Sequence, residues 1–273
     1  MDYDPIKKDA GRFFNCCRAS RILFFRLLNL LLLRSWHVRR EIRGWAKTAP
    51  PGAAVLDAGS GFGQYVWFVS KLKGKYRVKG VDVKQEETDL CNRFPGGRHA
   101  GGRVRFEKAD LNSFSEPQTY DLILCVDVLE HITDDVKVMK NLYGSLKGGG
   151  MLLISTPSDR GGSDVHDEGG NSFIGEHVRD GYGWGEITEK LSLAGFDKTE
   201  VRYSYGRWGQ MSWKISMKYP VKMVSAGRIF FLVLPLYYLV TFPVALLLNF
   251  FDLYGRHSTG TGLIVKAYKL SDK

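Results

Sequence analysis

From Ala53 onward, short apolar runs alternate with segments of helical periodicity, and this feature limits the possible folds more than any other. Strands and helices that alternate at this spacing predict an α/β fold with a doubly wound parallel sheet. The expected strands are Ala53–Ala58, Tyr76–Val83, Val104–Lys108, Tyr120–Val126, Met151–Thr156, Lys198–Tyr205 and Gly262–Leu270. The expected helices run from the first strand's turn through Lys73, over Asp134–Leu146 with the glycines of Gly148–Gly150 as a cap, and over Gly185–Ala194.

The first strand runs into a glycine-rich turn, with the sequence VLDAGSGFG from Val55 to Gly63. Glycine is required where φ is positive and where the backbone passes close to a ligand. The helix that follows offers free N–H groups to a carboxylate. Because Gln64 follows the last glycine, the GxGxxG pattern of dinucleotide enzymes is not met.

Each of the first four strands leads into an acidic residue, namely Asp57, Asp82, Asp110 and Asp127. Ligands of open α/β sheets bind outside the carboxyl ends of the strands. A carboxylate at Asp82 can accept both ribose hydroxyls of an adenosine, and one at Asp110 can accept the adenine amino group. The alternative is that each acid only caps the helix after it.

Residues 53–205 resemble the class I S-adenosylmethionine (SAM) dependent methyltransferases, especially the group with the ubiquinone-pathway O-methyltransferases. The resemblance rests on VLDAGSGFG, GVDV, FEKADL, YDLILCVDVLEHI and GGGMLLISTP, and it spans more than half of the chain. It implies a Rossmann-like sheet of seven strands whose last strand is antiparallel, with SAM as cofactor and S-adenosylhomocysteine as product.

The resemblance also implies which residues hold the cofactor. The three glycines would contact the methionine part of SAM, Asp82 the ribose and Asp110 the adenine, and the turn at Asp127 would lie beside the sulfonium. Ser60 stands where many members of the family carry Cys. The full expected set is Asp57, Gly59, Ser60, Gly61, Phe62, Gly63, Asp82, Val83, Asp110, Leu111 and Asp127.

Methyl transfer from a sulfonium depends mainly on holding the reacting atoms in line. An oxygen acceptor also needs a base. The candidates are His131 after the fourth strand, His177 after the fifth, and His166 in a glycine-rich loop. Each could instead be a surface or structurally bonded histidine.

Asp127, Glu130 and His131 reproduce an acid-x-x-acid-His spacing that holds a divalent ion in some relatives. Carboxylates would suit magnesium, but an imidazole is less expected there. The same letters occur in metal-free relatives, so no metal is expected.

The chain carries a net charge of +10 and has a pI near 9.4, which favours an anionic partner. Many early basic residues surround an apolar run at Ile22–Leu33, and one or two basic amphipathic helices are expected over 7–43. Lys7, Lys8, Arg18, Arg21, Arg26 and Asn29 share one helical arc. This pattern favours a helix in the lipid interface whose arginines reach headgroups, over nucleic acid as the partner. The alternative is a helix packed on the domain.

The run from Ile229 to Phe251 has no charged residue and is long enough for a membrane span. A single crossing would separate the last strand from the strand at 198–205, with which it pairs in the family. Pro235 and Pro243 therefore predict a re-entrant or shallow hairpin and a monotopic insertion. A buried helix pair in a soluble lid is the alternative. Four basic residues before the run could contact headgroups, namely Lys214, Lys218, Lys222 and Arg228.

We therefore expect four regions: basic helices over 1–45, a cofactor-binding core over 46–205, an apolar insertion over 206–257 and the last core strand over 258–273. The resemblance and the insertion together predict methyl transfer to a lipophilic or membrane-borne small molecule, at oxygen, on the cytoplasmic face of a membrane. The alternatives are a soluble small-molecule methyltransferase with a hydrophobic lid and a SAM-binding membrane protein without catalysis. The sequence leaves the oligomeric state open.

Overall fold

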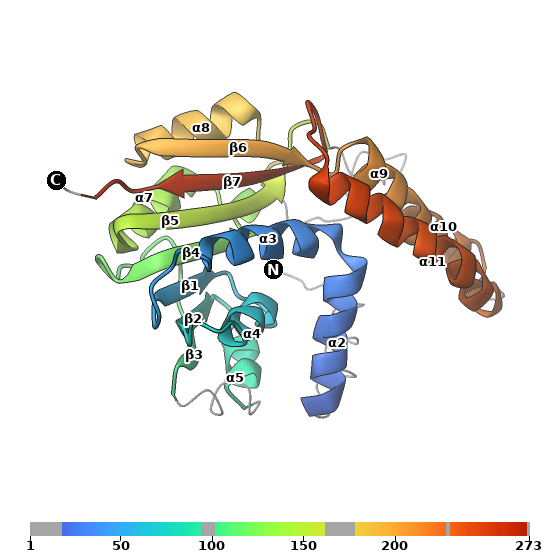
Figure 1. Ribbon diagram of the computed structural model, residues 1–273, viewed down its shortest axis with the longest axis horizontal. Helices are drawn as coiled ribbons and strands as arrows, with labels where there is room; N and C mark the ends of the chain where they lie inside the picture. Colours follow the sequence, from blue (N-terminus) through green and yellow to red (C-terminus); the bar gives the residue numbers. More distant parts are fainter. Residues whose placement is uncertain (1–17, 94–101, 162–177, 228–229, 272–273) are drawn as a thin grey trace.

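A computed structural model describes residues 18–93, 102–161, 178–227 and 230–271. Its centre is a seven-stranded sheet in the order β3-β2-β1-β4-β5-β7-β6 (Figure 1). All neighbours are parallel except β7, which is antiparallel to β5 and to β6. The strands are β1 Ala54–Ala58, β2 Arg77–Asp82, β3 Val104–Lys108, β4 Tyr120–Val126, β5 Leu146–Pro157, β6 Lys198–Ser204 and β7 Gly262–Tyr268.

Helices cover both faces of the sheet. The helices and single turns are α2 Arg18–Leu31, α3 Leu33–Trp45, α4 Gln64–Ser70, α5 Gln85–Arg93, η1 Leu129–His131, α7 Asp135–Ser145, α8 Trp184–Leu193, α9 Arg207–Trp213, η2 Lys214–Lys218, α10 Tyr219–Ala226 and α11 Phe230–Tyr254. The predicted Rossmann-like sheet of seven strands with an antiparallel last strand is confirmed.

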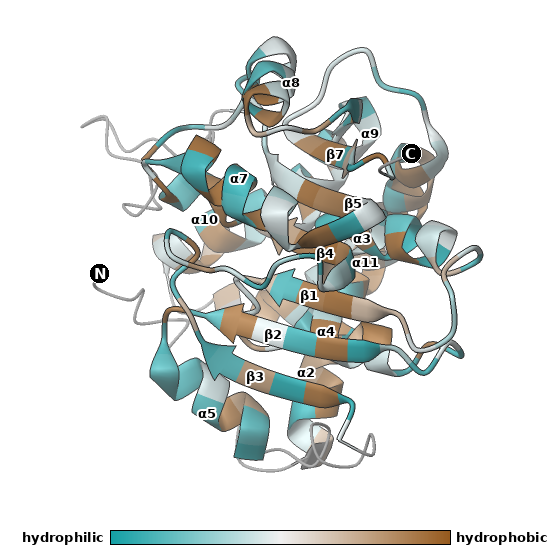
Figure 2. Ribbon diagram, turned by 90° about the vertical axis from the view of Figure 1, so that its left-hand side faces the viewer, coloured by the Kyte–Doolittle hydropathy of each residue, from teal (hydrophilic) through white to brown (hydrophobic). Residues whose placement is uncertain are grey.

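Two hydrophobic cores fill the space between the sheet and its helices. On one face, Val138 and Leu142 of α7 and Ile187 of α8 pack against the sheet. On the other face, Val38 of α3 and Val66 of α4 do the same. Figure 2 shows hydrophobic residues along the strands between these layers. Burial on both faces explains why the central strands are almost continuously apolar.

The glycines of Gly148–Gly150 do not cap the preceding helix, as the sequence had suggested. Helix α7 ends at Ser145, and Leu146 already pairs with Tyr120 in the sheet. Gly149 adopts a φ of 78° and donates its N–H to the carbonyl of Lys269. The glycines therefore belong to the irregular start of β5, where the register with β4 shifts.

The N-terminal helix α2 packs on the domain with Arg21 and Asn29 facing inward. Arg21 is buried and donates to the carbonyl of Phe62 at 2.7 Å and to Cys91 Sγ at 2.9 Å. Asn29 is also buried and accepts from Ser35 and from Gln64. The expectation that this arginine reaches lipid headgroups is wrong, because its guanidinium is held against the glycine-rich turn.

Helices α9, η2 and α10 run outward and α11 returns, so that together they form a helical hairpin (Figure 1). The predicted break at the prolines is wrong, because α11 is continuous through Pro235 and Pro243. A proline removes one helical hydrogen bond and can bend a helix without ending it. The two legs are joined by side chains instead: Tyr237 donates to the carbonyl of Ile215 at 2.7 Å, and Tyr238 to that of Ser216 at 2.9 Å.

The helical hairpin leaves the sheet at the carboxyl ends of the parallel strands. Ser204 ends β6 opposite Gly262 at the start of β7, and Pro157 ends β5 opposite the same residue. Figure 1 shows the arrows of β5 and β6 pointing toward the hairpin. Within α11, Leu232–Tyr254 is long and apolar enough to cross a membrane, and only 11% of its most apolar window is buried.

Candidate active site

The glycine-rich turn folds back over the end of β2. The N–H groups of Gly59 and Ser60 both donate to the carbonyl of Val81 at 2.9 Å. Gly59 has a φ of 83°, and a Cβ there would come 2.3 Å from Val128 Cγ2. Gly61 and Gly63 are also left-handed, at 45° and 78°. Glycine favours this turn, because side chains are strained at positive φ and would clash with Val128 at Gly59 and with Phe106 at Gly63.

Asp57, at the end of β1, is a buried carboxylate directly beneath this turn. Burial raises its pKa to about 7, the charge of Asp82 adds to the rise, and the backbone N–H of Val66 opposes it. Its Oδ2 atom is buried without a hydrogen-bond partner among the described residues. A buried carboxylate in this state gains from a cationic or hydrogen-bonding ligand.

Asp82, at the end of β2, connects that strand to the turn. Its two carboxylate oxygens accept the N–H of Gly61 at 2.9 Å and the N–H of Lys84 at 3.0 Å. Two acids at the tips of neighbouring strands thus lie against the same left-handed turn. Their negative charge favours a ligand that carries positive charge or several donors.

The third strand tip is more open. The exposed carboxylate of Asp110 accepts from the N–H and from the side-chain amide of Asn112, at 2.9 and 3.0 Å. Val83 is exposed beside Asp82, whereas the side chain of Leu111 is packed in the hydrophobic core. Leu111 can therefore meet a ligand only with its backbone.

Asp127, after β4, has a left-handed φ of 52° and forms an ion pair with Arg34 of α3. Arg34 is also tied to the far side of the sheet, because its backbone N–H donates to the Tyr205 hydroxyl at 3.0 Å. No sequence pattern pointed to Arg34, since it lies far from Asp127 along the chain.

Glu130 and His131 lie in the single turn η1 after β4. Glu130 is buried, which raises its pKa, and it accepts from Thr156 Oγ1 at 3.2 Å. His131 is half-buried at the same edge. Within the described ranges, no three His, Cys, Asp or Glu side chains gather closely enough to hold a metal ion. The other two candidate bases, His166 and His177, lie outside the described residues.

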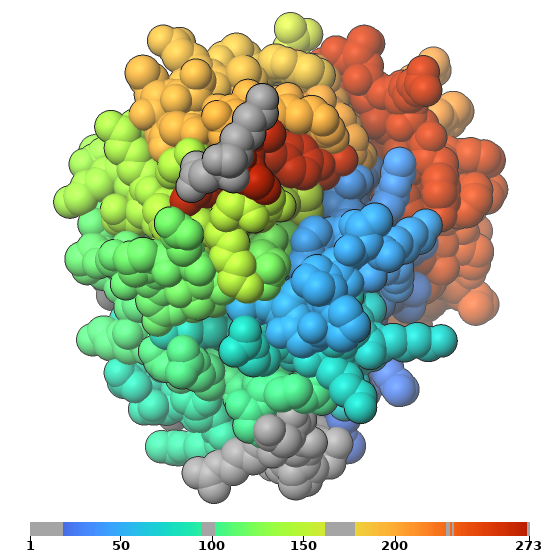
Figure 3. Space-filling view, turned by 60° about the vertical axis from the view of Figure 1, so that its left-hand side comes forward, coloured from blue at the N-terminus to red at the C-terminus, as the bar shows by residue number. Residues whose placement is uncertain are grey.

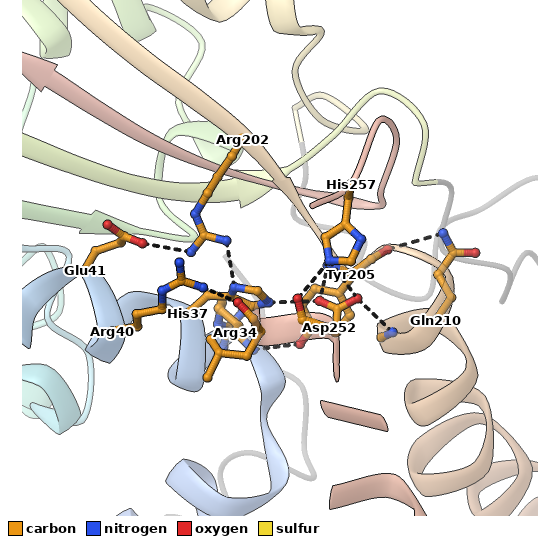
Figure 4. Close-up of polar contacts among 11 residues, drawn as sticks. Arg34, His37, Arg40, Glu41, Arg202, Tyr205, Gln210, Asp252 and His257 are labelled. Carbon is orange, nitrogen blue, oxygen red and sulfur yellow. Dashed lines mark hydrogen bonds and ion pairs between the residues drawn. The ribbon is translucent and has the colours of Figure 1, made fainter. Parts of the chain in front are cut away.

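A second polar cluster lies where the helical hairpin joins the domain (Figure 4). Its centre is Asp252 of α11, which is fully buried. The carboxylate accepts from His37 Nε2 at 3.0 Å and from the N–H groups of Gly209 at 2.9 Å and Tyr205 at 3.2 Å. His257 Nε2 lies 3.4 Å from its Oδ2 atom.

The tautomer of His37 follows from its neighbours. Arg202 has only donors, and its Nη1 lies 3.0 Å from His37 Nδ1, so this nitrogen accepts and Nε2–H donates to Asp252. Burial lowers the pKa of His37, and the bond to Asp252 only partly opposes that shift. The sequence showed Asp252 as the acid directly after the apolar run, but it gave no sign of its partner in α3.

The fold and the strand-tip geometry define the class of protein, which is an α/β protein built to hold a nucleotide-like cofactor at the carboxyl edge of its sheet. A family model described as a methyltransferase domain matches residues 55–150. The ubiquinone biosynthesis O-methyltransferase of Xanthomonas campestris pv. campestris is 27% identical over 111 residues, which cover 41% of this chain and 46% of that protein. The corresponding enzyme of Ralstonia nicotianae is 28% identical over 116 residues, 41% and 47% of the two chains.

Solved structures show the same fold. Phosphoethanolamine N-methyltransferase 2 of Haemonchus contortus, in complex with S-adenosyl-L-methionine, has a TM-score of 0.59 at 19% identity and covers 86% of this chain and 53% of that one. The [4+2]-cyclase SpnF has a TM-score of 0.58 at 16% identity, with 87% and 82% covered. The chain spans about half the length of the curated relatives that it matches. Together, these findings support a class I SAM-dependent methyltransferase, and residues 55–150 are the part that matches the family model.

Proposed function

We propose that this chain transfers the methyl group of SAM to a lipophilic or membrane-borne small molecule, at an oxygen atom. The main support for this proposal is that the candidate site and the helical hairpin lie at the same edge of the sheet. The acids of the first strand tips and the exposed apolar helical hairpin both lie at the carboxyl ends of the strands. An acceptor that reaches this edge therefore meets an apolar surface on its way.

The residues present fit SAM. The orphaned Oδ2 of buried Asp57 and the carboxylate of Asp82 suit a ligand with a positive charge and two ribose hydroxyls. A Cβ on Gly61 would meet nothing within 4 Å, so the turn is open on that side and a ligand can approach its backbone closely. The named ligand of one structural relative, S-adenosyl-L-methionine, is consistent with this assignment.

When bound, SAM would supply an electrophilic methyl group. We assign the turn from Gly59 to Gly63 to its methionine part, Asp82 and Val83 to the ribose, and Asp110 with the Leu111 backbone to the adenine. Asp127 would then border the reacting end of the site. The contribution of these residues is to bind and orient, which is the main source of rate in a displacement at carbon.

The acceptor's hydroxyl proton must leave during transfer to oxygen, and a histidine suits this step. His131 lies at the correct edge in η1. His177 and His166 stay as further candidates from the sequence. The names of the ubiquinone-pathway relatives favour an oxygen acceptor and a lipophilic product class.

We further propose that the protein works at the cytoplasmic face of a membrane, which the helical hairpin enters without crossing. Both ends of the hairpin return to the same sheet, because Ser204 and Gly262 pair with each other. A crossing would place one of these residues on the wrong side. A lid that covers a soluble site is the competing role, but its α11 helix would then expose most of its apolar surface to water.

The test is incubation of the purified protein with methyl-labelled SAM and a total lipid extract, followed by identification of the labelled species. The proposal requires label in an organic-soluble product and formation of S-adenosylhomocysteine. Label only in water-soluble metabolites would overturn the lipophilic acceptor. SAM binding without any transfer would indicate a non-catalytic role or another reaction, such as that of the cyclase with the same fold.

A further inference from the structure

Helix α2 exposes a stripe of leucines on its outer side. Leu23, Leu27, Leu30 and Leu31 are spaced as one helical face, and they are exposed by 52%, 37%, 39% and 36%. The opposite face, with Arg21 and Asn29, is buried against the domain. A surface helix in water has the reverse arrangement, with polar residues outward. Arg26 is exposed beside these leucines. The outer side of α2 is therefore an apolar stripe with a basic edge.

The helical hairpin presents a second apolar surface at the same end of the sheet. On α11, Leu232, Leu236 and Leu239 are exposed by 81%, 66% and 72%. Beneath the exposed side chains, the N-terminal helices touch the hairpin: Leu33 of α3 lies so close to Gly209 of α9 that a Cβ there would come 2.7 Å from Leu33 Cδ2. Figure 3 shows the orange and red atoms of the hairpin beside the blue atoms of the N-terminal helices.

The charges in these two segments point to one kind of partner. Residues 18–34 and 207–251 contain no Asp or Glu. Their basic residues are Arg18, Arg21, Arg26, Arg34, Arg207, Lys214, Lys218, Lys222 and Arg228, of which Arg21 is buried and Arg34 pairs with Asp127. An apolar surface with basic flanks suits a bilayer that contains anionic lipids. A second copy of this chain would bring like charges together.

The strand-tip site lies between the two surfaces. Arg21 of α2 contacts the glycine-rich turn through Phe62, and Arg34, just after α2, contacts Asp127. On the other side, Asp252 joins the hairpin to the end of β6 through Tyr205. A bilayer that touches both surfaces would therefore lie over the strand tips.

We propose that α2 and the helical hairpin contact one anionic bilayer on either side of the strand-tip site, so that the membrane itself covers the site. The consequence for the acceptor, which rests on the proposed function, is that it enters from the lipid without passing through water. The leucine stripe of α2 is thus a membrane contact separate from the hairpin.

The first test is flotation of the full chain with vesicles of phosphatidylcholine mixed with phosphatidylglycerol, and with phosphatidylcholine alone. The variant Leu23→Gln/Leu27→Gln should bind the anionic vesicles at least about tenfold more weakly than the unaltered chain. The matched control, Leu193→Gln/Leu270→Gln, changes two exposed leucines away from both surfaces and should bind unchanged. Equal binding by both variants would overturn the proposal.

The second test places a fluorophore that responds to polarity on Leu27→Cys, with Cys16 and Cys17 replaced by Ser. Its emission should shift to the blue when anionic vesicles are added, and the same label on Leu193→Cys should not respond. A label that is blue in water and unchanged by vesicles would mean that residues 1–17 cover the stripe. A shift that grows with protein concentration alone would mean a second copy. Either result overturns the proposal.

The failure of the membrane contact and the failure of the proposed methyl transfer can be told apart. If the Leu23→Gln/Leu27→Gln variant keeps SAM affinity and turnover of a detergent-dispersed acceptor but loses turnover in vesicles, both proposals stand. If it keeps turnover in vesicles, the role of α2 falls and the proposed function stands. If the unaltered chain binds vesicles but transfers no methyl group from SAM, the proposed function falls and the membrane contact stands.

Discussion

The two sides of the strand-tip site are built in different ways. The side that we assign to the cofactor, the cofactor side, consists of backbone turns close in sequence, in which Asp82 holds Gly61 and Lys84 within one βαβ unit. The side next to the helical hairpin, which we assign to the acceptor and call the acceptor side, depends on long-range polar contacts, since His37 and Asp252 lie 215 residues apart. Arg34 links the two sides through Asp127 and Tyr205.

This difference implies that a substitution can abolish cofactor binding without detaching the helical hairpin, and the reverse. The cofactor side is held by the packed sheet and needs no contribution from the hairpin. The contacts of the hairpin with the domain include a buried carboxylate, Asp252, whose loss leaves several donors unsatisfied. Four substitutions test this separation.

The largest effect is expected from Asp252→Ala. It removes the acceptor for His37, Gly209 and Tyr205, so the free energy of unfolding should fall by about 3–5 kcal/mol in urea titrations. SAM affinity, measured by calorimetry, should change little. Asp197→Ala, which removes an exposed acceptor, is the control and should cost less than about 1 kcal/mol. A parallel loss of SAM affinity would contradict the separation.

Asp82→Ala should have the opposite pattern, with a loss of SAM affinity and no loss of the hairpin's function. SAM affinity should fall at least about 100-fold, because two charge-assisted hydrogen bonds to the ribose are lost. Vesicle flotation should be unchanged, since the hairpin and α2 are not altered. Asp89→Ala, a nearby acid on α5, is the control for a general change of charge. Unchanged affinity in the Asp82 variant would refute the ribose contact.

Gly59→Ala should weaken SAM binding by about tenfold, because the new Cβ meets Val128 and the φ of 83° is strained. Adding Val128→Ala relieves the clash but not the strain, so it should restore only part of the affinity. Gly61→Ala is the matched variant, since its Cβ would meet nothing within 4 Å and only strain is left. Equal losses at both glycines would show that the contact with Val128 is unimportant.

The smallest effect concerns pH. Since the pKa of His37 is lowered in the folded protein, the unfolded chain binds its proton more tightly. The stability that His37 contributes is therefore complete above its unfolded pKa near 6.5, and it is lost as the pH falls below that value. The cost should approach about 1 kcal/mol per pH unit.

His37→Gln should remove this dependence, and the difference between the two chains measures it. Asp57 acts in the opposite direction, because its raised pKa of about 7 makes protonation favour the folded state as the pH falls. It is common to both chains and cancels in the comparison. If the unaltered chain and the His37→Gln variant had identical profiles of stability against pH, a group other than His37 would cause the loss at low pH.

Much of the cofactor side could be predicted from the sequence, because strand periodicity and glycine turns are local signals. The strands at 104–108 and 120–126 were predicted to the residue, and the acids at their tips lie where parallel strands must place them. The error at Gly148–Gly150 arose because a glycine run marks a helix end and an irregular strand equally well.

The acceptor side could be predicted only in composition. The apolar run was evident, but the prolines gave no information on whether α11 bends or continues, since the contacts of Tyr237 and Tyr238 with the other leg decide that. The arc that contains Arg21 and Asn29 was also evident. Whether this arc faces the protein or the surroundings depends on its partners Gln64 in α4 and Cys91 in α5, which the sequence of α2 does not reveal.

By itself, then, the sequence determined the order of strands and helices, the left-handed turn and the acidic strand tips, because each depends on neighbours within a few residues. Only the tertiary structure decided that α2 turns its leucines outward, that Arg34 meets Asp127 and that Asp252 anchors the hairpin. These features depend on which buried donors find acceptors across the fold, and satisfying buried polar groups is a property of the whole packed molecule.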